Sequence, residues 1–153
     1  MKKFFFVIGC LFLLYTQTMA QDTVPVDDSK FAVTIGVLNG GGSLVGADFE
    51  IMAGQRVGLQ VGAGLVGLGA GINYHLKPGI RSSMLSLQYW HQGVGDSYTQ
   101  SLIGPSYVYR AKKLLTAQVG FGFALEEGPN WPADKDQPPA MLMYSIGIYL
   151  PVK

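Results

Sequence analysis

The segment from Leu114 to Leu125 alternates in a way that few folds allow. Apolar side chains occupy its odd positions from Leu115 onward, and small or uncharged polar residues occupy its even positions from Thr116 to Ala124. Alternation with a period of two over about ten residues is typical of a β-strand with two different faces. A soluble strand normally carries charge on its wet face, and neither face of this segment does. About ten residues is also the length of a tilted strand that crosses a bilayer, so the segment predicts one strand of a membrane barrel.

The same pattern recurs along the rest of the chain. Seven further segments alternate, at residues 30–38, 43–52, 57–65, 68–76, 83–90, 97–110 and 142–150. Short glycine-rich or polar connections separate them, and Pro105 weakens only the middle of the sixth segment. The sequence therefore predicts an all-β fold, an eight-stranded antiparallel up-and-down transmembrane β-barrel over residues 29–152. Eight strands leave an interior just wide enough for side chains to fill, which suits the glycine, serine and glutamine of the second face.

The first twenty residues are typical of an export signal rather than of the fold. Two lysines precede an apolar run from Phe4 to Tyr15, and Ala20 offers the small residue at which such signals are cleaved. The apolar run is too short to cross a membrane as a helix. We therefore expect residues 1–20 to be a cleaved signal peptide and residues 21–28 to be a periplasmic lead-in.

Composition and charge placement indicate a compartment and partners. Charged residues make up 14% of the chain, against about 25% in soluble domains. Together with the export signal, this favours the outer membrane of a Gram-negative bacterium, with both termini periplasmic and the long connection at 126–139 external. A net charge of +1 excludes a general attraction to nucleic acid. The expected partners are outer-membrane lipids and other outer-membrane proteins. No cofactor is expected, nor a metal, because two histidines and Cys10 show no ligand spacing.

Aromatic residues and charges suggest how the two ends of the barrel are built. Aromatic residues near the strand ends would form two interfacial girdles: Tyr89, Trp90, Tyr98, Phe123 and Tyr144 outside, and Phe31, Tyr74, Tyr107 and Tyr109 on the periplasmic side. Six ionisable residues on the inward face would form a lumen charge network: Lys30, Asp48, Glu50, Arg56, His75 and Arg110. Hairpin counting across the 39–42 and 53–56 turns places Glu50 between Lys30 and Arg56.

With these eight segments in hand, the chain resembles the small eight-stranded outer-membrane proteins of the OmpA/OmpX type. The resemblance covers residues 29–152 and rests on the alternation and the short connections. It implies a non-enzymatic barrel with a structural or interaction role in the cell envelope, or a small subunit of a larger outer-membrane complex.

Two other functions stay open at the level of sequence. His91, Asp96 and Ser97 cluster near the external rim, where an outer-membrane acyltransferase or lipase would place its catalytic groups. A soluble ligand-binding barrel is the other alternative, although its exterior would need more charge than the sequence supplies. The two-face pattern further predicts that a charge at Val119 harms the fold, whereas Gly120→Ser, on the inward face, is tolerated.

Overall fold

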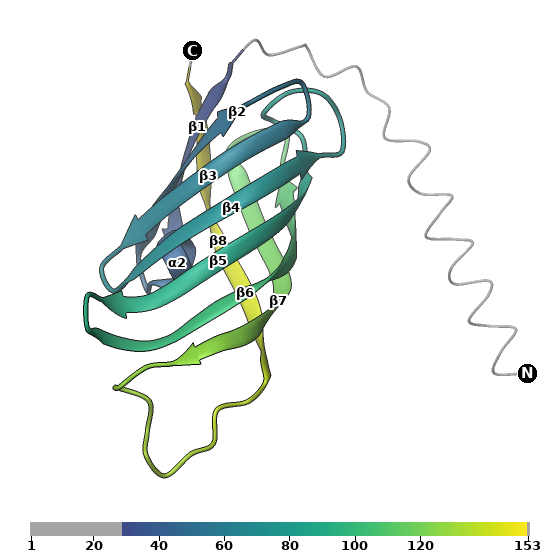
Figure 1. The fold of residues 1–153 in the computed structure, drawn as a ribbon. Coiled ribbons are helices and arrows are strands. Elements are labelled where there is room, and N and C mark those ends of the chain that lie inside the picture. The colour runs from purple at the N-terminus through teal and green to yellow at the C-terminus, as the bar shows by residue number, and fades with distance from the viewer. Residues whose placement is uncertain (1–28, 153) are drawn as a thin grey trace, which may run out of the picture.

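The computed structural model describes residues 29–152, and the eight expected strands are all present in it. They are β1 Phe31–Val37, β2 Gly46–Met52, β3 Val57–Gly64, β4 Gly67–His75, β5 Met84–Val94, β6 Ser97–Arg110, β7 Leu115–Glu127 and β8 Ala140–Val152. Each strand pairs antiparallel with the next, and β8 pairs with β1 to close the barrel (Figure 1). The prediction of a closed eight-stranded antiparallel barrel is therefore confirmed. The expected signal peptide and lead-in, 1–20 and 21–28, lie outside the described residues.

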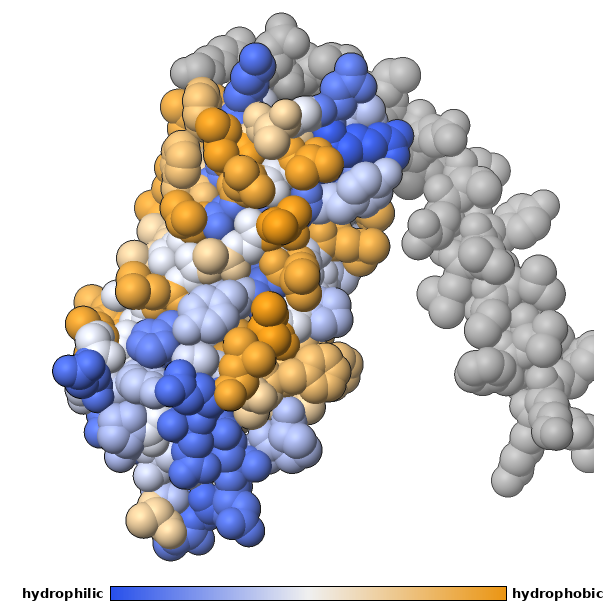
Figure 2. All heavy atoms as spheres, in the orientation of Figure 1, coloured by the Kyte–Doolittle hydropathy of each residue, from blue (hydrophilic) through white to orange (hydrophobic). Residues whose placement is uncertain are grey.

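The two faces of each strand meet different surroundings, as the alternation predicts. On β7, Val119 and Phe121 point outward and are more than half exposed, whereas Thr116 and Gln118 point into the barrel and are buried. The same division holds on the other strands, so hydrophobic side chains cover the wall of the barrel and hydrophilic ones gather at its two ends (Figure 2). Within residues 29–152, no helix is long and apolar enough to cross a membrane.

The strands differ in length between the two halves of the chain. Strands β1 to β4 have seven to nine residues, and β5 to β8 have eleven to fourteen. We call the end at which β1 begins and β8 ends the terminal end, and the opposite end the loop end. The extra residues of β5 to β8 extend the loop end, from which the connection between β7 and β8 projects (Figure 1).

The connection between β1 and β2 is not the simple external turn that Asn39 to Gly42 predicted. These residues form a short helical turn, α2 (Asn39–Gly42), which folds into the barrel and buries Asn39, Gly40 and Gly41. Asp48 draws the turn inward, since the Asn39 side chain donates to its carboxylate at 2.8 Å. Only glycine fits at Gly40, because its φ is +63° and an added Cβ would lie 2.3 Å from the carbonyl oxygen of Ala63.

The connection at residues 76–83 fills the terminal end in the same manner. Ile80 is completely buried, and its carbonyl oxygen accepts a hydrogen bond from the Arg110 guanidinium. The amide of Gly79 donates to the carbonyl oxygen of Gln55 at 3.0 Å, which ties this connection to the neighbouring turn. Both ends of the lumen are thus occupied by inward-folded chain.

Between the two ends, the lumen also contains an apolar cluster that the sequence did not predict. Trp90, Leu102 and Met143 are buried together there. The assignment of Trp90 to the external aromatic girdle is therefore wrong. Its even position on β5 puts it on the inward face, where the indole N–H donates to Oε1 of Gln88 at 3.0 Å.

The inward face of β7 has less room than the alternation suggested. A Cβ added at Gly120 would lie 2.4 Å from the carbonyl oxygen of Pro105 and 2.4 Å from the Cβ of Ser106. Backbone atoms on the paired strand cannot move aside as a flexible side chain can. The expected tolerance of Gly120→Ser is therefore contradicted by the close approach of β6.

We predict that Gly120→Ser lowers the free energy of unfolding by roughly 1–3 kcal/mol, the usual cost of overpacking. Gly54→Ser is the matched control, because an added Cβ at Gly54 meets nothing within 4 Å. We expect this control to lie within about 0.5 kcal/mol of the unmodified protein. Denaturant unfolding of the refolded protein measures both changes, and equal effects would contradict the close packing at Gly120.

Candidate functional site

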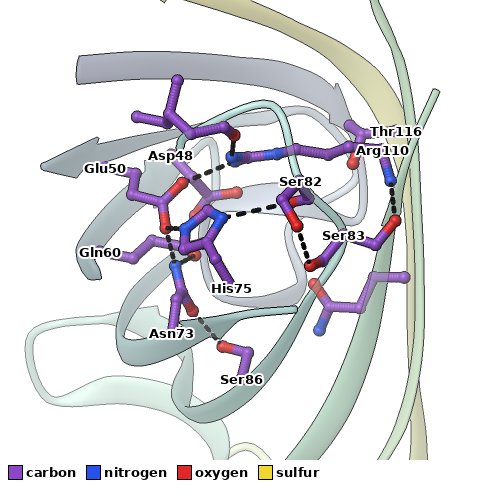
Figure 3. Close-up of polar contacts among 12 residues, drawn as sticks. Asp48, Glu50, Gln60, Asn73, His75, Ser82, Ser83, Ser86, Arg110 and Thr116 are labelled. Carbon is purple, nitrogen blue, oxygen red and sulfur yellow. Dashed lines mark hydrogen bonds and ion pairs between the residues drawn. The ribbon is translucent and has the colours of Figure 1, made fainter. Parts of the chain in front are cut away.

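A cluster of buried polar side chains lies in the lumen near its terminal end. We call it the lumen cluster, and its members are Glu50, Asn73, His75, Ser86 and Arg110 (Figure 3). All five are inward-facing residues of strands β2, β4, β5 and β6. Side chains of this kind are costly to bury unless each finds a partner, so their hydrogen bonds decide what the cluster does.

Glu50 is the centre of the lumen cluster, with only 2% of its surface exposed. Its Oε2 lies 2.7 Å from Nη2 of Arg110, and its Oε1 lies 3.1 Å from Nε2 of His75. The Asn73 amide donates to the same Oε1, and Asn73 in turn accepts a hydrogen bond from Ser86 at 2.5 Å. The carboxylate is therefore held by an ion pair with Arg110 of β6 and by hydrogen bonds with Asn73 and His75 of β4, which offset the cost of its burial.

Gly58 explains how Glu50 reaches partners two strands away. On β3, Gly58 pairs with Met52 of β2 and with Asn73 of β4. A Cβ at Gly58 would lie 2.5 Å from Oε1 of Glu50. Because the glycine has no side chain, the carboxylate can cross above β3 to His75 and Asn73. The inward glycines of β3 thus make space for longer polar side chains, as the sequence indicated.

His75 connects the lumen cluster to the inward-folded connection at 76–83. Its Nδ1 lies 3.2 Å from the carbonyl oxygen of Ser82, and its Nε2 faces Glu50. The two ring nitrogens therefore lie between the carboxylate of β2 and the backbone of the 76–83 connection. Arg110 makes a second connection, through the carbonyl oxygen of Ile80. The cluster therefore fastens the 76–83 connection inside the barrel.

Three of the six charges predicted for the lumen lie apart from this cluster. Asp48 is buried towards the loop end, where it accepts hydrogen bonds from the amide of Gly40 and from the Asn39 side chain. Arg56 is exposed in its turn, and its Nη1 donates to the carbonyl oxygen of Leu76 at 3.3 Å. Lys30 is exposed as well.

The predicted register of the first hairpin differs from the observed one. Ala32, not Lys30, faces Glu50 across β1 and β2, and Gln60 rather than Arg56 faces it across β2 and β3. The difference between β1 and β2 arises because α2 and the residues after it fold inward, so that β1 ends at Val37 and β2 begins only at Gly46. Hairpin counting assumed a four-residue turn at 39–42, so the residue pairs that it predicted are displaced from the observed ones.

The residues predicted for a rim site are not brought together. Ser97 accepts a hydrogen bond from the Asn130 side chain at 2.7 Å, and Asp96 is exposed in the β5–β6 turn. Nδ1 of His91 instead lies 3.0 Å from the hydroxyl oxygen of Ser101. The same oxygen accepts a hydrogen bond from the Tyr89 hydroxyl at 3.2 Å.

Ser101 was missed at the level of sequence, because its pairing with His91 depends on an irregularity of the β5–β6 hairpin. The turn at Gly95 and Asp96 would by itself pair His91 with Gln100, and the register shift between Gln92 and Gly93 moves the pairing to Ser101. A serine hydroxyl beside a histidine is the arrangement that nucleophilic catalysis uses. Ser101 is only 2% exposed, however, which leaves a substrate carbonyl almost no surface to approach.

Within residues 29–152, no group of three or more histidine, cysteine or acidic side chains is placed to hold a metal ion. No family of known proteins, no curated protein and no solved structure matches this chain. Its function is therefore argued from the geometry of the barrel alone.

We predict that Glu50→Gln lowers the free energy of unfolding by roughly 3–5 kcal/mol, because it leaves Arg110 and His75 buried without their anion. Adding Arg110→Met should recover part of this loss. The measurement is a double-mutant cycle on the denaturant unfolding of refolded protein. Lys30→Met is the matched control, since the exposed Lys30 should add to Glu50→Gln without coupling. A coupling of Glu50 to Lys30 rather than to Arg110 would contradict the observed register.

Proposed function

We propose that this chain is an outer-membrane β-barrel of the OmpA/OmpX type, embedded in the outer membrane of a Gram-negative bacterium with both termini periplasmic. The observation that carries the proposal is the outward face of the wall. Each of the eight strands carries exposed apolar side chains on this face; on β8, for example, these are Leu142, Tyr144, Ile146, Ile148 and Leu150. A soluble monomer rarely exposes an apolar patch larger than a few hundred Å². A wall of this kind is the outer surface that a bilayer requires.

The placement of charged side chains inside the barrel supports the same proposal. A soluble ligand-binding barrel would place its apolar face inside and its charge outside. Here the Glu50–Arg110 ion pair lies inside. From Phe31 to Met52 and from Val57 to His75 the chain contains no Asp, Glu, Lys or Arg except Asp48 and Glu50, and both of these point inward. Such a distribution stabilises a barrel in hydrocarbon and destabilises one in water.

The filled lumen favours a structural or interaction role over transport. The 76–83 connection occupies its terminal end, α2 occupies its loop end, and Trp90, Leu102 and Met143 pack between them. Eight-stranded barrels have interiors that side chains can fill completely. The protein would therefore act in the cell envelope through its surfaces and not as a pore.

The connection between β7 and β8 is the polar surface that would meet a partner. It has a defined shape, because the Trp131 indole donates to the carbonyl oxygen of Lys135 at 2.7 Å and Asn130 donates to Ser97. Asp134, Lys135 and Asp136 are exposed on it. In the proposed orientation this connection is external, where it suits a small non-enzymatic subunit of a larger outer-membrane complex.

A lipid-modifying enzyme is the second candidate, and one observation favours it. His91 and Ser101 form a hydrogen-bonded pair on the wall near the loop end, at the height where a lipid ester would lie. The burial of Ser101 and the separation of Asp96 and Ser97 from His91 weigh against it.

The proposal predicts that Val119→Arg, at a position that is 52% exposed, lowers the free energy of unfolding by roughly 2–4 kcal/mol in lipid vesicles. An arginine at an exposed site costs almost nothing in water, but it is expensive at the middle of a bilayer. Gln55→Arg, in an exposed turn, is the matched control and should change stability by less than about 0.5 kcal/mol. If the two variants unfold alike, the wall faces water and the proposal is refuted.

For the second candidate, we predict that the purified protein and its Ser101→Ala variant release fatty acid from phospholipid vesicles at the same background rate. Ser97→Ala is the control, since Ser97 lies away from His91. Hydrolysis that Ser101→Ala abolishes and Ser97→Ala preserves would establish the enzyme instead of the non-enzymatic barrel.

A further inference from the structure

The loop end of the β1–β4 half carries an unusual group of exposed apolar residues. We call it the apolar rim, and it consists of Leu44, Val45, Leu65, Val66 and Leu68. Leu44 is 69% exposed, and Leu65, at the tip of the β3–β4 hairpin, is 73% exposed. Hairpin tips in water are normally polar, because nothing else covers them.

The other connections of the barrel have the opposite character. The turn after β2 carries Arg56, the one after β4 carries Lys77, and the β5–β6 turn carries Asp96. Around the apolar rim, in contrast, the polar side chains within residues 37–46 and 62–69 are those of Asn39 and Ser43, and both are buried. These two segments therefore present no exposed polar side chain, and the polar residue beside Leu68 is His91 of β5, which is half-buried and paired with Ser101.

The backbone donors at the tip of the β3–β4 hairpin are satisfied by the protein itself. The amide of Leu65 donates to the carbonyl oxygen of Val45 at 3.1 Å, and the amide of Val66 donates to the Ser43 hydroxyl at 3.3 Å. Ser43 in turn donates to the carbonyl oxygen of Gly40. In water a turn can leave such donors to the solvent, whereas in hydrocarbon they must be paired internally. The inward fold of α2 is what supplies these partners.

The strands beneath the apolar rim are too short to reach across a bilayer. β3 has eight residues and β4 has nine. At about 3.4 Å per residue and a tilt of about 40°, β3 rises roughly 20 Å, less than the apolar band of about 25 Å that such barrels present. Arg56 and Lys77 hold the other end of this hairpin near the periplasmic interface in the proposed orientation. The tip would therefore stop short of the external interface.

We propose that the apolar rim is submerged among the lipid acyl chains of the outer leaflet, so that the barrel sits unevenly in the membrane. On the β1–β4 side its wall ends inside the hydrocarbon, and on the β5–β8 side the strands and the 128–139 connection reach water (Figure 1). Acyl chains fit the rim better than a protein does, because protein interfaces have a polar border and this rim continues into the apolar wall at Val61 and Ile72. This inference rests on the proposed function.

The test measures the depth of single labelled positions in the full chain reconstituted in phosphatidylcholine vesicles. Cys10, the only native cysteine, is replaced by serine, and cysteine is introduced at Val66, Val61 or Asp96 for labelling with an environment-sensitive fluorophore. Brominated acyl chains quench a label inside the hydrocarbon, and iodide quenches one in water. We expect Val66 to lose fluorescence to brominated lipid as Val61 does and to resist iodide, while Asp96 loses fluorescence to iodide.

The outcomes separate this inference from the proposed function. If Val61 itself resists brominated lipid, the wall does not face the bilayer and both fail. If Val61 is quenched by brominated lipid but Val66 is quenched by iodide as Asp96 is, only the submerged rim is refuted. If Val66 resists both quenchers, a second copy of the chain covers the rim, and the lipid assignment is overturned. Leu65→Cys repeats the measurement should Val66→Cys fail to fold, since the Leu65 side chain is almost free of packing.

Discussion

Closure of the sheet is the constraint on which every other feature of this protein depends. β1 pairs with β8 from Phe31 opposite Val152 to Val37 opposite Ile146, so the sheet has no free edge. All eight strands then satisfy their backbone groups from their neighbours, whatever surrounds the barrel. Because the backbone groups are paired in this way, an apolar outer wall needs no hydrogen bonds from water. The polar side chains are correspondingly left to the inside and to the two ends.

The same closure makes the lumen narrow, and its contents must share a fixed volume. Charges enter only as compensated groups, as Glu50 does with Arg110 and His75. Glycines leave room where longer side chains cross, as Gly58 does beneath Glu50. The inward connections at α2 and 76–83 complete the filling, and each is fastened by a carboxylate or a cation of the wall. The result is a closed cylinder whose interior holds side chains and two inward-folded connections.

The outer surface is uneven, and the unevenness follows from where the chain places its long strands. β5 to β8 extend the loop end into a polar region, whereas β1 to β4 stop early and end in the apolar rim. The inward fold of α2 links these features, since it shortens the first hairpin and supplies Ser43 to the backbone at the β3–β4 tip. In the membrane orientation that we propose, one side of the barrel faces lipid at its loop end and the other reaches water.

The alternation along the chain was sufficient to predict the number of strands, their order and the faces within them, but not the exposure of Lys30 and Arg56, which lie just outside strands. Parity is a local property of an extended chain, so Val119 had to point outward and Gln118 inward once β7 was recognised. Parity did not predict which side chains contact one another inside the barrel. Glu50 meets Arg110 instead of Lys30, His91 meets Ser101 instead of Ser97, and Gly120 is closed in by β6. These contacts depend on register, on whether a connection folds inward, and on the volume left inside the cylinder. Only the closed tertiary structure decides those quantities, because each arises from strands distant in sequence competing for the same space.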